Sequence, residues 1–228
     1  MKTTFKLLAG AVLVSAGLAQ AAPINLIENG SFEKPGIPTN TASQFVNTDP
    51  SNPFAWITGA NGVELRDNRN FPAGYTHIAA DGDQYIELAV EGNVANGNSS
   101  IWQDVFLKAG QEYTLSFAYS PRAPFGEDEN EANVSFVDWS INLVADASSQ
   151  SKDSAINLWK YVTVKLIGTG DTERLTFAAA GSNGSYGMFF DDVSLTATPL
   201  PGAALLFGTS LAGFLAARKR RKAAALAA

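Results

Sequence analysis

The amino-acid sequence predicts an all-β protein in which two sheets pack as a sandwich. Three observations support this fold class. Short runs of alternating apolar and polar residues recur between clusters of Gly, Asn, Pro and Ser. Helical periodicity is absent between residues 23 and 198. This stretch has the length of one domain and contains no cysteine, so a single apolar core must hold it together.

The clearest strand is predicted at residues 112–120. Tyr113, Leu115, Phe117 and Tyr119 alternate there with small or polar residues, which gives one buried face. Residues 100–107 alternate in the same way, and the turn-forming residues 108–111 follow, so the pattern favours a hairpin between the two strands. Further strands are expected at residues 84–90, 134–143, 158–167, 174–180 and 188–196.

The N-terminal segment has the organisation of a secretory signal peptide. Lys2 and Lys6 precede an apolar run over residues 7–19, and Ala19-Gln20-Ala21 is a small-x-small cleavage site. We therefore expect residues 1–21 to be a signal peptide and residues 22–198 to be the exported domain.

The C-terminal segment, residues 199–228, has the pattern of a short membrane helix. Residues 202–217 carry no charge, and as a helix they would measure about 24 Å, against the ~30 Å of a bilayer core. Five cations follow directly and would keep the C-terminus in the cytoplasm. These cations are Arg218, Lys219, Arg220, Arg221 and Lys222.

Pro199-Leu200-Pro201, the short apolar helix and the basic cluster together resemble the PEP-CTERM sorting signal of Gram-negative bacteria. Leu200 stands where the usual motif has Glu. The resemblance implies transient insertion in the inner membrane, recognition by an exosortase, and a final location at the cell surface or in the extracellular matrix. An ordinary single-pass anchor is the alternative.

Composition excludes several classes of function. With no cysteine and His77 as the single histidine, the chain cannot build a Cys/His zinc site, a thiol nucleophile or a disulfide framework. Residues 23–198 hold 9 Lys+Arg and 22 Asp+Glu, a formal charge of −13. Such a field repels phosphate backbones, so nucleic acid is not an expected partner.

Five segments, in this order, resemble the galactose-binding-like jelly roll, a superfamily that includes the family 4, 9 and 22 carbohydrate-binding modules. The segments are NLIENGSFE at 25–33, DGDQYIEL at 81–88, IWQ at 101–103, AGQEYTLSF at 109–117 and FFDDVSL at 189–195. The resemblance implies a jelly-roll β-sandwich and a polysaccharide ligand.

The same resemblance implies a structural calcium ion that ties the first strand to the last. Carried over by position, the ligands would be Glu33, the carbonyls of Asn29 and Gly30, and Asp191, with Asp192 as the alternate. Calcium requires six to eight oxygen ligands, and two adjacent acids beside an apolar strand need a cation or hydrogen-bond donors.

Sugar binding requires aromatic faces and polar groups that pair with hydroxyls. Trp56 lies in an apolar run, so a core role is favoured for it over a ligand platform. Trp102 and Trp139 lie beside polar residues in strands whose other face is apolar, which predicts outward-facing indoles. The full set of candidate ligand-binding residues is Trp102, Trp139, Tyr119, Arg122, Glu87 and Gln103.

These observations predict an exported, non-catalytic module that binds carbohydrate. The alternative is a structural or adhesive matrix protein without a sugar site. A carboxylate-based glycoside hydrolase is the least favoured function, because no motif singles out a pair among the 22 acidic residues.

Overall fold

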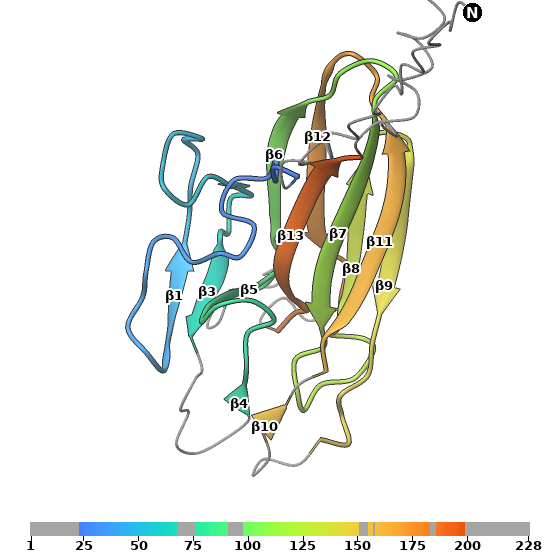
Figure 1. Ribbon diagram of the computed structural model, residues 1–228. Helices are drawn as coiled ribbons and strands as arrows, with labels where there is room; N and C mark the ends of the chain where they lie inside the picture. The colour runs from blue at the N-terminus through green and yellow to red at the C-terminus, as the bar shows by residue number, and fades with distance from the viewer. Residues whose placement is uncertain are drawn as a thin grey trace, which may run out of the picture.

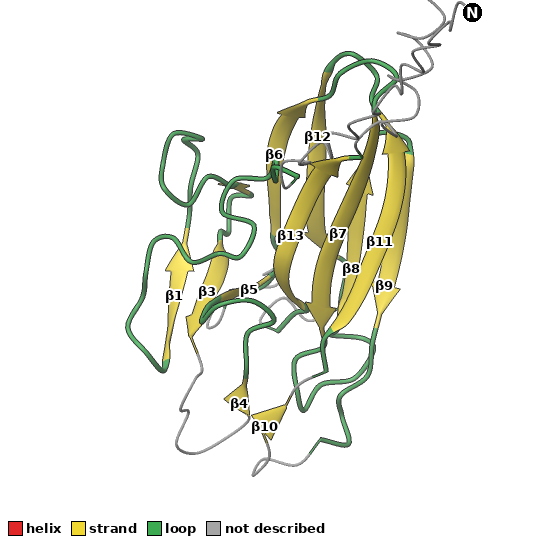
Figure 2. Cartoon of the chain, viewed as in Figure 1, coloured by secondary structure: helices red, strands yellow, loops and turns green. Residues whose placement is uncertain are grey.

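The computed structural model describes residues 23–67, 76–90, 98–150, 155–156, 158–182 and 186–198. These residues form strands and loops only (Figure 2). The strands are β1 (Thr41–Phe45), β2 (Ile57–Thr58), β3 (Val63–Asp67), β4 (Thr76–His77), β5 (Tyr85–Glu87), β6 (Ser100–Phe106), β7 (Glu112–Ser120), β8 (Glu131–Phe136), β9 (Trp139–Val144), β10 (Ala155–Ile156), β11 (Lys160–Ile167), β12 (Thr172–Ala179) and β13 (Phe189–Ala197).

Two antiparallel sheets make the sandwich, as predicted. One has six strands in the order β1-β3-β5-β13-β7-β11, and the other has five in the order β2-β6-β12-β8-β9. Figure 1 shows β13, β7 and β11 in front of β12, β8 and β9. The two short strands β4 and β10 pair in parallel beside the end at which β7 ends and β13 begins (Figure 1).

The interior is dense in aromatic side chains. The Trp56 indole is fully buried, as predicted, and packs edge-on against Phe177 at 5.8 Å. Phe177 in turn contacts Phe117 at 5.2 Å and Phe190 at 4.9 Å. Since Phe177 belongs to one sheet and Phe117 and Phe190 to the other, these rings join the two layers.

One predicted strand is in fact a hairpin. Residues 134–143 were expected to be continuous, but β8 ends at Phe136 and β9 begins at Trp139, which pairs with Phe136. Val137 adopts a φ of 58°, in the left-handed region that β-branched residues rarely occupy. A two-residue turn built without glycine gives no recognisable signal in the sequence.

The predicted hairpin between residues 100–107 and 112–120 is wrong. β6 pairs with β2 and β12, whereas β7 pairs with β11 and β13, so the connection crosses from one sheet to the other. Both strands bury one face in the shared core, with Val105 and Leu115 inside. An arch between sheets and a hairpin within a sheet require the same alternation, so periodicity cannot separate them.

The segment before β1 is fastened to the last strand. Asn25 forms a bridge with Thr196, and its side-chain oxygen accepts the backbone N–H of Leu195 at 2.8 Å. Farther along, the N–H of Val193 donates to the carbonyl of Gly30 at 2.9 Å. A Cβ at position 30 would lie 1.9 Å from the Val193 carbonyl oxygen, so only glycine fits this approach.

Every described strand and every core residue lies between residues 25 and 197, so this interval contains the folded domain. The predicted signal peptide and sorting signal lie outside the described residues. Within the described residues, no helix is long and apolar enough to span a membrane.

Candidate functional site

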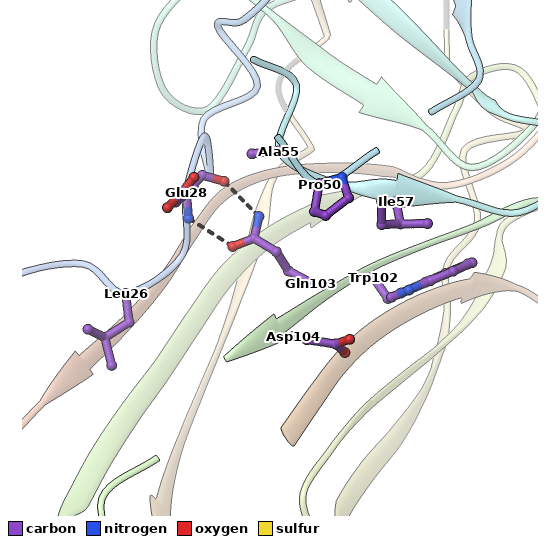
Figure 3. A pocket seen from close by; sticks show the side chains of 8 residues that line it. All are labelled: Leu26, Glu28, Pro50, Ala55, Ile57, Trp102, Gln103 and Asp104. Atoms are coloured by element: carbon purple, nitrogen blue, oxygen red, sulfur yellow. Dashed lines mark hydrogen bonds between the residues drawn. The ribbon is translucent and has the colours of Figure 1, made fainter. Parts of the chain in front are cut away.

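A hollow of about 370 Å³ opens on the outer side of β6 (Figure 3). Trp102, Gln103 and Asp104 of β6 form one wall. The facing wall comes from two segments distant in sequence, and its residues are Leu26, Glu28, Pro50, Ala55 and Ile57. The volume is in the range typical of small-molecule sites.

Hydrogen bonds hold the two walls together. The Gln103 side chain accepts the backbone N–H of Glu28 at 2.9 Å and donates to the Glu28 carbonyl oxygen at 2.8 Å, as Figure 3 shows. This pair of bonds positions the exposed Glu28 at the rim.

Arg174 and Asp104 hold the orientation of the Trp102 side chain. The Arg174 guanidinium lies over its ring at 5.1 Å and forms two bonds with the Asp104 carboxylate, of 2.7 and 2.8 Å. A guanidinium held by a carboxylate in this way orients the half-buried indole.

A second hollow of about 480 Å³ continues the first. It shares Glu28, Pro50 and Ala55 with it and extends towards Lys34 and Asn52. We call the two hollows together the groove. One end presents an indole and the other end presents polar groups, which suits an elongated ligand.

Glu87 and Arg122 lie away from the groove, at the β4/β10 end of the six-stranded sheet. The fully buried Glu87 carboxylate accepts bonds from Arg66 Nη1 at 2.5 Å and from Arg122 Nη1 at 2.6 Å. It also accepts the backbone N–H of Gly187 at 3.0 Å. Arg66 makes a further 2.9 Å ion pair with Glu64. We call Glu64, Arg66, Glu87 and Arg122 the Glu87 cluster.

Aromatic rings enclose the Glu87 cluster. The Arg122 guanidinium lies 4.4 Å from the Tyr186 ring, which stacks on Phe125 at 4.1 Å. On the other side, the Arg66 guanidinium lies 5.8 Å from the ring of Phe189. The guanidiniums are thus held between carboxylates and ring faces.

The protein environment fixes the protonation of the groups around the Glu87 cluster. Burial alone would lower the pKa of Arg66, but the adjacent Glu87, Tyr85 and Glu64 raise it above its usual value. Burial lowers the pKa of His77 to about 3, and the charges of Arg66 and Arg122 act in the same direction. Burial also raises the pKa of the Tyr85 hydroxyl. At neutral pH, His77 is therefore an uncharged imidazole and Tyr85 keeps its proton.

Two of the predicted sugar-binding residues face the core. Tyr119 and Trp139 both pack against the core cluster, and the Trp139 ring lies 6.5 Å from that of Phe117. The expectation of an outward-facing indole at position 139 is therefore wrong. Because the turn at residues 137–138 starts a new strand, Trp139 shares its face with Ile141 and Leu143 instead of pointing outwards.

Several of the oxygens nominated for calcium accept hydrogen bonds from N–H donors. Glu33 Oε1 accepts the backbone N–H groups of Asp83 and Gln84, both at 2.8 Å. Asp191 Oδ2 accepts those of Ala80 and Asp81, and its Oδ1 accepts that of Asp192 at 2.7 Å. The carbonyls do likewise, because Asn29 accepts from Phe32 and from the Trp56 indole, and Gly30 accepts from Val193.

Calcium binding by these groups stays a prediction. Within the described part of the chain, no three Asp, Glu or His side chains gather as metal ligands. Burial raises the pKa of Asp191 to about 8, although its three N–H partners favour the carboxylate. Asp192 is less buried, and burial together with the charge of Asp81 raises its pKa as well. Backbone and side-chain hydrogen bonds tie the first segment to the last.

Sequence reasoning missed Glu64 and Arg66, two of the four members of the Glu87 cluster. Residues 63–67 form a strand that is absent from the predicted set, although Val63 and Leu65 alternate with Glu64 and Arg66. That alternation was the available signal for a strand with charged residues on one face. Nothing local in the sequence indicates that this face meets Arg122.

Comparison with known proteins places the fold. No curated protein matches the chain. Among solved structures, it is similar to the Stig cyclase Fisc from Fischerella sp. TAU in complex with (3Z)-3-(1-methyl-2-pyrrolidinylidene)-3H-indole. The TM-score is 0.56 at 19% identity, covering 79% of this chain and 100% of that one.

It is also similar to TmCBM61 in complex with β-1,4-galactotriose. Here the TM-score is 0.50 at 15% identity, covering 77% of this chain and 99% of the other. Likeness at this level of identity shows the shared jelly-roll sandwich. Residues 25–196 match the family model described as "Protein of unknown function (DUF642)", and the chain therefore belongs to the DUF642 family.

Proposed function

We propose that this protein is an exported, non-catalytic carbohydrate-binding module whose groove holds an extracellular polysaccharide. The observation that carries the proposal is the placement of Trp102 in an open groove beside Gln103, Asp104 and Glu28. An indole offers a face for the C–H surface of a pyranose ring, and the neighbouring acids and amide can pair with its hydroxyls.

Two further observations support a chain-like ligand. The groove continues from Trp102 past Glu28 to Lys34 and Asn52, so it is longer than either hollow alone. TmCBM61, whose fold the domain shares, was solved with β-1,4-galactotriose. A polysaccharide can use both the aromatic and the polar end of such a groove.

The two terminal segments indicate where in the cell this binding would occur. A signal peptide at residues 1–21 would export the domain, and the Pro-Leu-Pro signal with its basic cluster would present it to an exosortase at the inner membrane. The domain would then act at the cell surface or in the extracellular matrix of a Gram-negative bacterium.

The test is retardation of residues 22–198 in affinity gels that contain soluble polysaccharides, including the producer's own exopolysaccharide. Retardation by at least one glycan is expected, and Trp102→Ala should abolish it. Phe106→Ala is the matched control, because Phe106 lies two pleats along the same face of β6, is 63% exposed and does not line the groove. Its retardation should remain that of the wild type.

Absence of retardation by every glycan, with the domain folded, would contradict the proposal. It would favour the structural or adhesive matrix protein that the sequence offers as the alternative. Retardation that survives Trp102→Ala would place the sugar elsewhere on the domain.

A further inference from the structure

The strand β11 forms one edge of the six-stranded sheet and is the longest edge strand of the described sandwich. It has eight residues, whereas the other edge strands, β1, β9 and β2, have five, six and two. All eight residues of β11 pair with β7 in one unbroken register. Among the described residues, β7 is the only strand that pairs with β11. Every second residue of β11 therefore turns its backbone N–H and C=O groups away from the sheet.

Folded proteins usually protect such an edge, because it pairs readily with another chain. Short strands, bulges, prolines and charged side chains are the common means. The strand β11 contains no proline, no glycine and no bulge. Its two lysines are its protective feature, and one of them, Lys165, forms a 3.1 Å ion pair with Glu112 of β7. The strand therefore keeps most of the properties of an interior strand.

The outer face of β11 carries a large exposed apolar side chain at each end. Tyr161, Thr163, Lys165 and Ile167 alternate on this face, and all four are exposed. Tyr161 is 55% exposed although its hydroxyl bonds with Asp192, and Ile167 is 59% exposed. An antiparallel copy of the same strand reverses this order and brings the apolar ends of the two copies together.

Hydrogen-bond geometry restricts how two copies of β11 can meet. Along each strand, residues whose backbone groups point towards the other copy alternate with residues whose groups point away, and opposed residues must be of the same kind. A twofold axis between the copies therefore passes through a residue and never between two residues. An axis at Val164 sets Tyr161 of each copy opposite Ile167 of the other, which gives two apolar cross-strand pairs.

The neighbouring registers are less favourable. An axis at Thr163 would separate the apolar pairs, and an axis at Lys165 would set two ammonium groups directly opposite each other. With the axis at Val164, Lys165 faces Thr163 and Lys160 faces Gly168. Of the three registers, this one pairs apolar with apolar side chains and opposes no like charges.

Charge also favours β11 as the place where two copies meet. Residues 23–198 have a formal charge of −13, so two copies repel each other over most of their surface. The strand β11 contains two lysines and no Asp or Glu. Repulsion between copies is therefore reduced at this edge.

We propose that β11 pairs with β11 of a second copy around a twofold axis at Val164, which joins the two six-stranded sheets into one. The inference goes beyond the proposed function and does not depend on a glycan. Figure 1 shows β11 and β6, which forms one wall of the groove, at opposite sides of the sandwich. Both grooves of the dimer stay open, so one dimer can hold two polysaccharide segments.

Because the chain contains no cysteine, engineered disulfides test the register. Val164→Cys places two thiols opposite each other at the axis, where the Cα atoms are about 4.5–5.5 Å apart, within the range of a disulfide. Val162→Cys is the matched control, because Val162 is the same residue type on the same half-buried face. Its two thiols would lie about 13 Å apart along the strands. Mild oxidation of residues 22–198 should give a disulfide dimer with Val164→Cys and not with Val162→Cys.

Sedimentation velocity without sugar tests the association itself. Residues 22–198 should form a reversible dimer whose fraction rises with concentration. Thr163→Lys sets an ammonium group opposite Lys165 in both halves of the interface, so the dissociation constant should rise about tenfold or more. Thr172→Lys is the matched control, because Thr172 is also exposed but lies on β12 of the other sheet. Its dissociation constant should equal that of the wild type, and both variants should keep the wild-type melting temperature.

Three results would overturn this interface. They are a monomer at every concentration, a Val164→Cys protein that cross-links no better than Val162→Cys, and a dimer whose dissociation constant Thr163→Lys leaves unchanged. A monomeric domain would leave the β11 edge to a different chain. The two proposals fail separately, because the sedimentation and cross-linking experiments contain no glycan, whereas polysaccharide retardation and its loss in Trp102→Ala test only the groove.

Discussion

Glu87 and Arg122 are 35 positions apart in the chain, yet a 2.6 Å hydrogen bond joins their side chains at the end of the six-stranded sheet. The bond forms because β5 and the end of β7 lie on either side of the start of β13, where Phe189 pairs with both Glu87 and Ser120. Arg122 follows that strand end by two residues. Both had been predicted as sugar contacts, and the structure joins them to each other and to Arg66.

Glu87→Gln should strongly destabilise the domain. The substitution leaves Arg66 and Arg122 without their shared carboxylate in a buried position, and breaking a buried pair costs about 3 kcal/mol or more of unfolding free energy. Urea denaturation followed by tryptophan fluorescence measures it. As a control, Glu112→Gln removes the exposed pair with Lys165 and should cost less than about 1 kcal/mol. Equal effects of the two changes would show that the Glu87 cluster contributes no more than a surface pair.

Gln103→Leu should weaken both the fold and glycan binding. The change removes two bonds to the backbone of Glu28 and should lower the unfolding free energy by about 1–2 kcal/mol. Because Glu28 forms the rim of the groove, retardation by polysaccharide should fall as well. Gln44→Leu is the control, since Gln44 lies on β1, away from the groove, and its amide donates to the carbonyl oxygen of Asn61. Comparable loss of retardation in both variants would argue that Gln103 acts through stability alone.

His77 should make the domain sensitive to acid. Its pKa is about 3 in the fold against about 6.5 in an unfolded chain, so the unfolded state binds the extra proton between these values. The stability that this group contributes is complete above pH 6.5 and is lost as the pH falls towards 3. His77→Gln removes the titration, and its unfolding free energy should fall less steeply across this window, by up to about 1.4 kcal/mol per pH unit. Parallel pH profiles of the two proteins would exclude a buried neutral His77.

EDTA should leave the melting temperature unchanged. The carboxylates of Glu33 and Asp191 hold backbone N–H groups, so the link between the first and last segments needs no cation. Scanning calorimetry with EDTA, and again with added calcium, checks this. A fall of several degrees in EDTA that calcium restores would mean that a cation displaces those N–H bonds, as the jelly-roll resemblance implies.

Local patterns in the sequence determined the fold class. Alternation identified the strand at residues 112–120, and the apolar run around Trp56 correctly indicated a core residue. Both inferences depend only on which side chains can tolerate burial, and neighbours along the chain carry that information.

Tertiary structure alone decided which residues meet. Whether β6 turns back on β7 or crosses to the other sheet depends on which strands pair, and the partners of β6 are residues more than 40 positions away. The same long-range pairing put Trp102 in the groove and Glu87 between Arg66 and Arg122, whereas the turn at residues 137–138 directed Trp139 to the core. Side-chain alternation specifies a buried face but not the strand that covers it, because many pairings bury that face equally well.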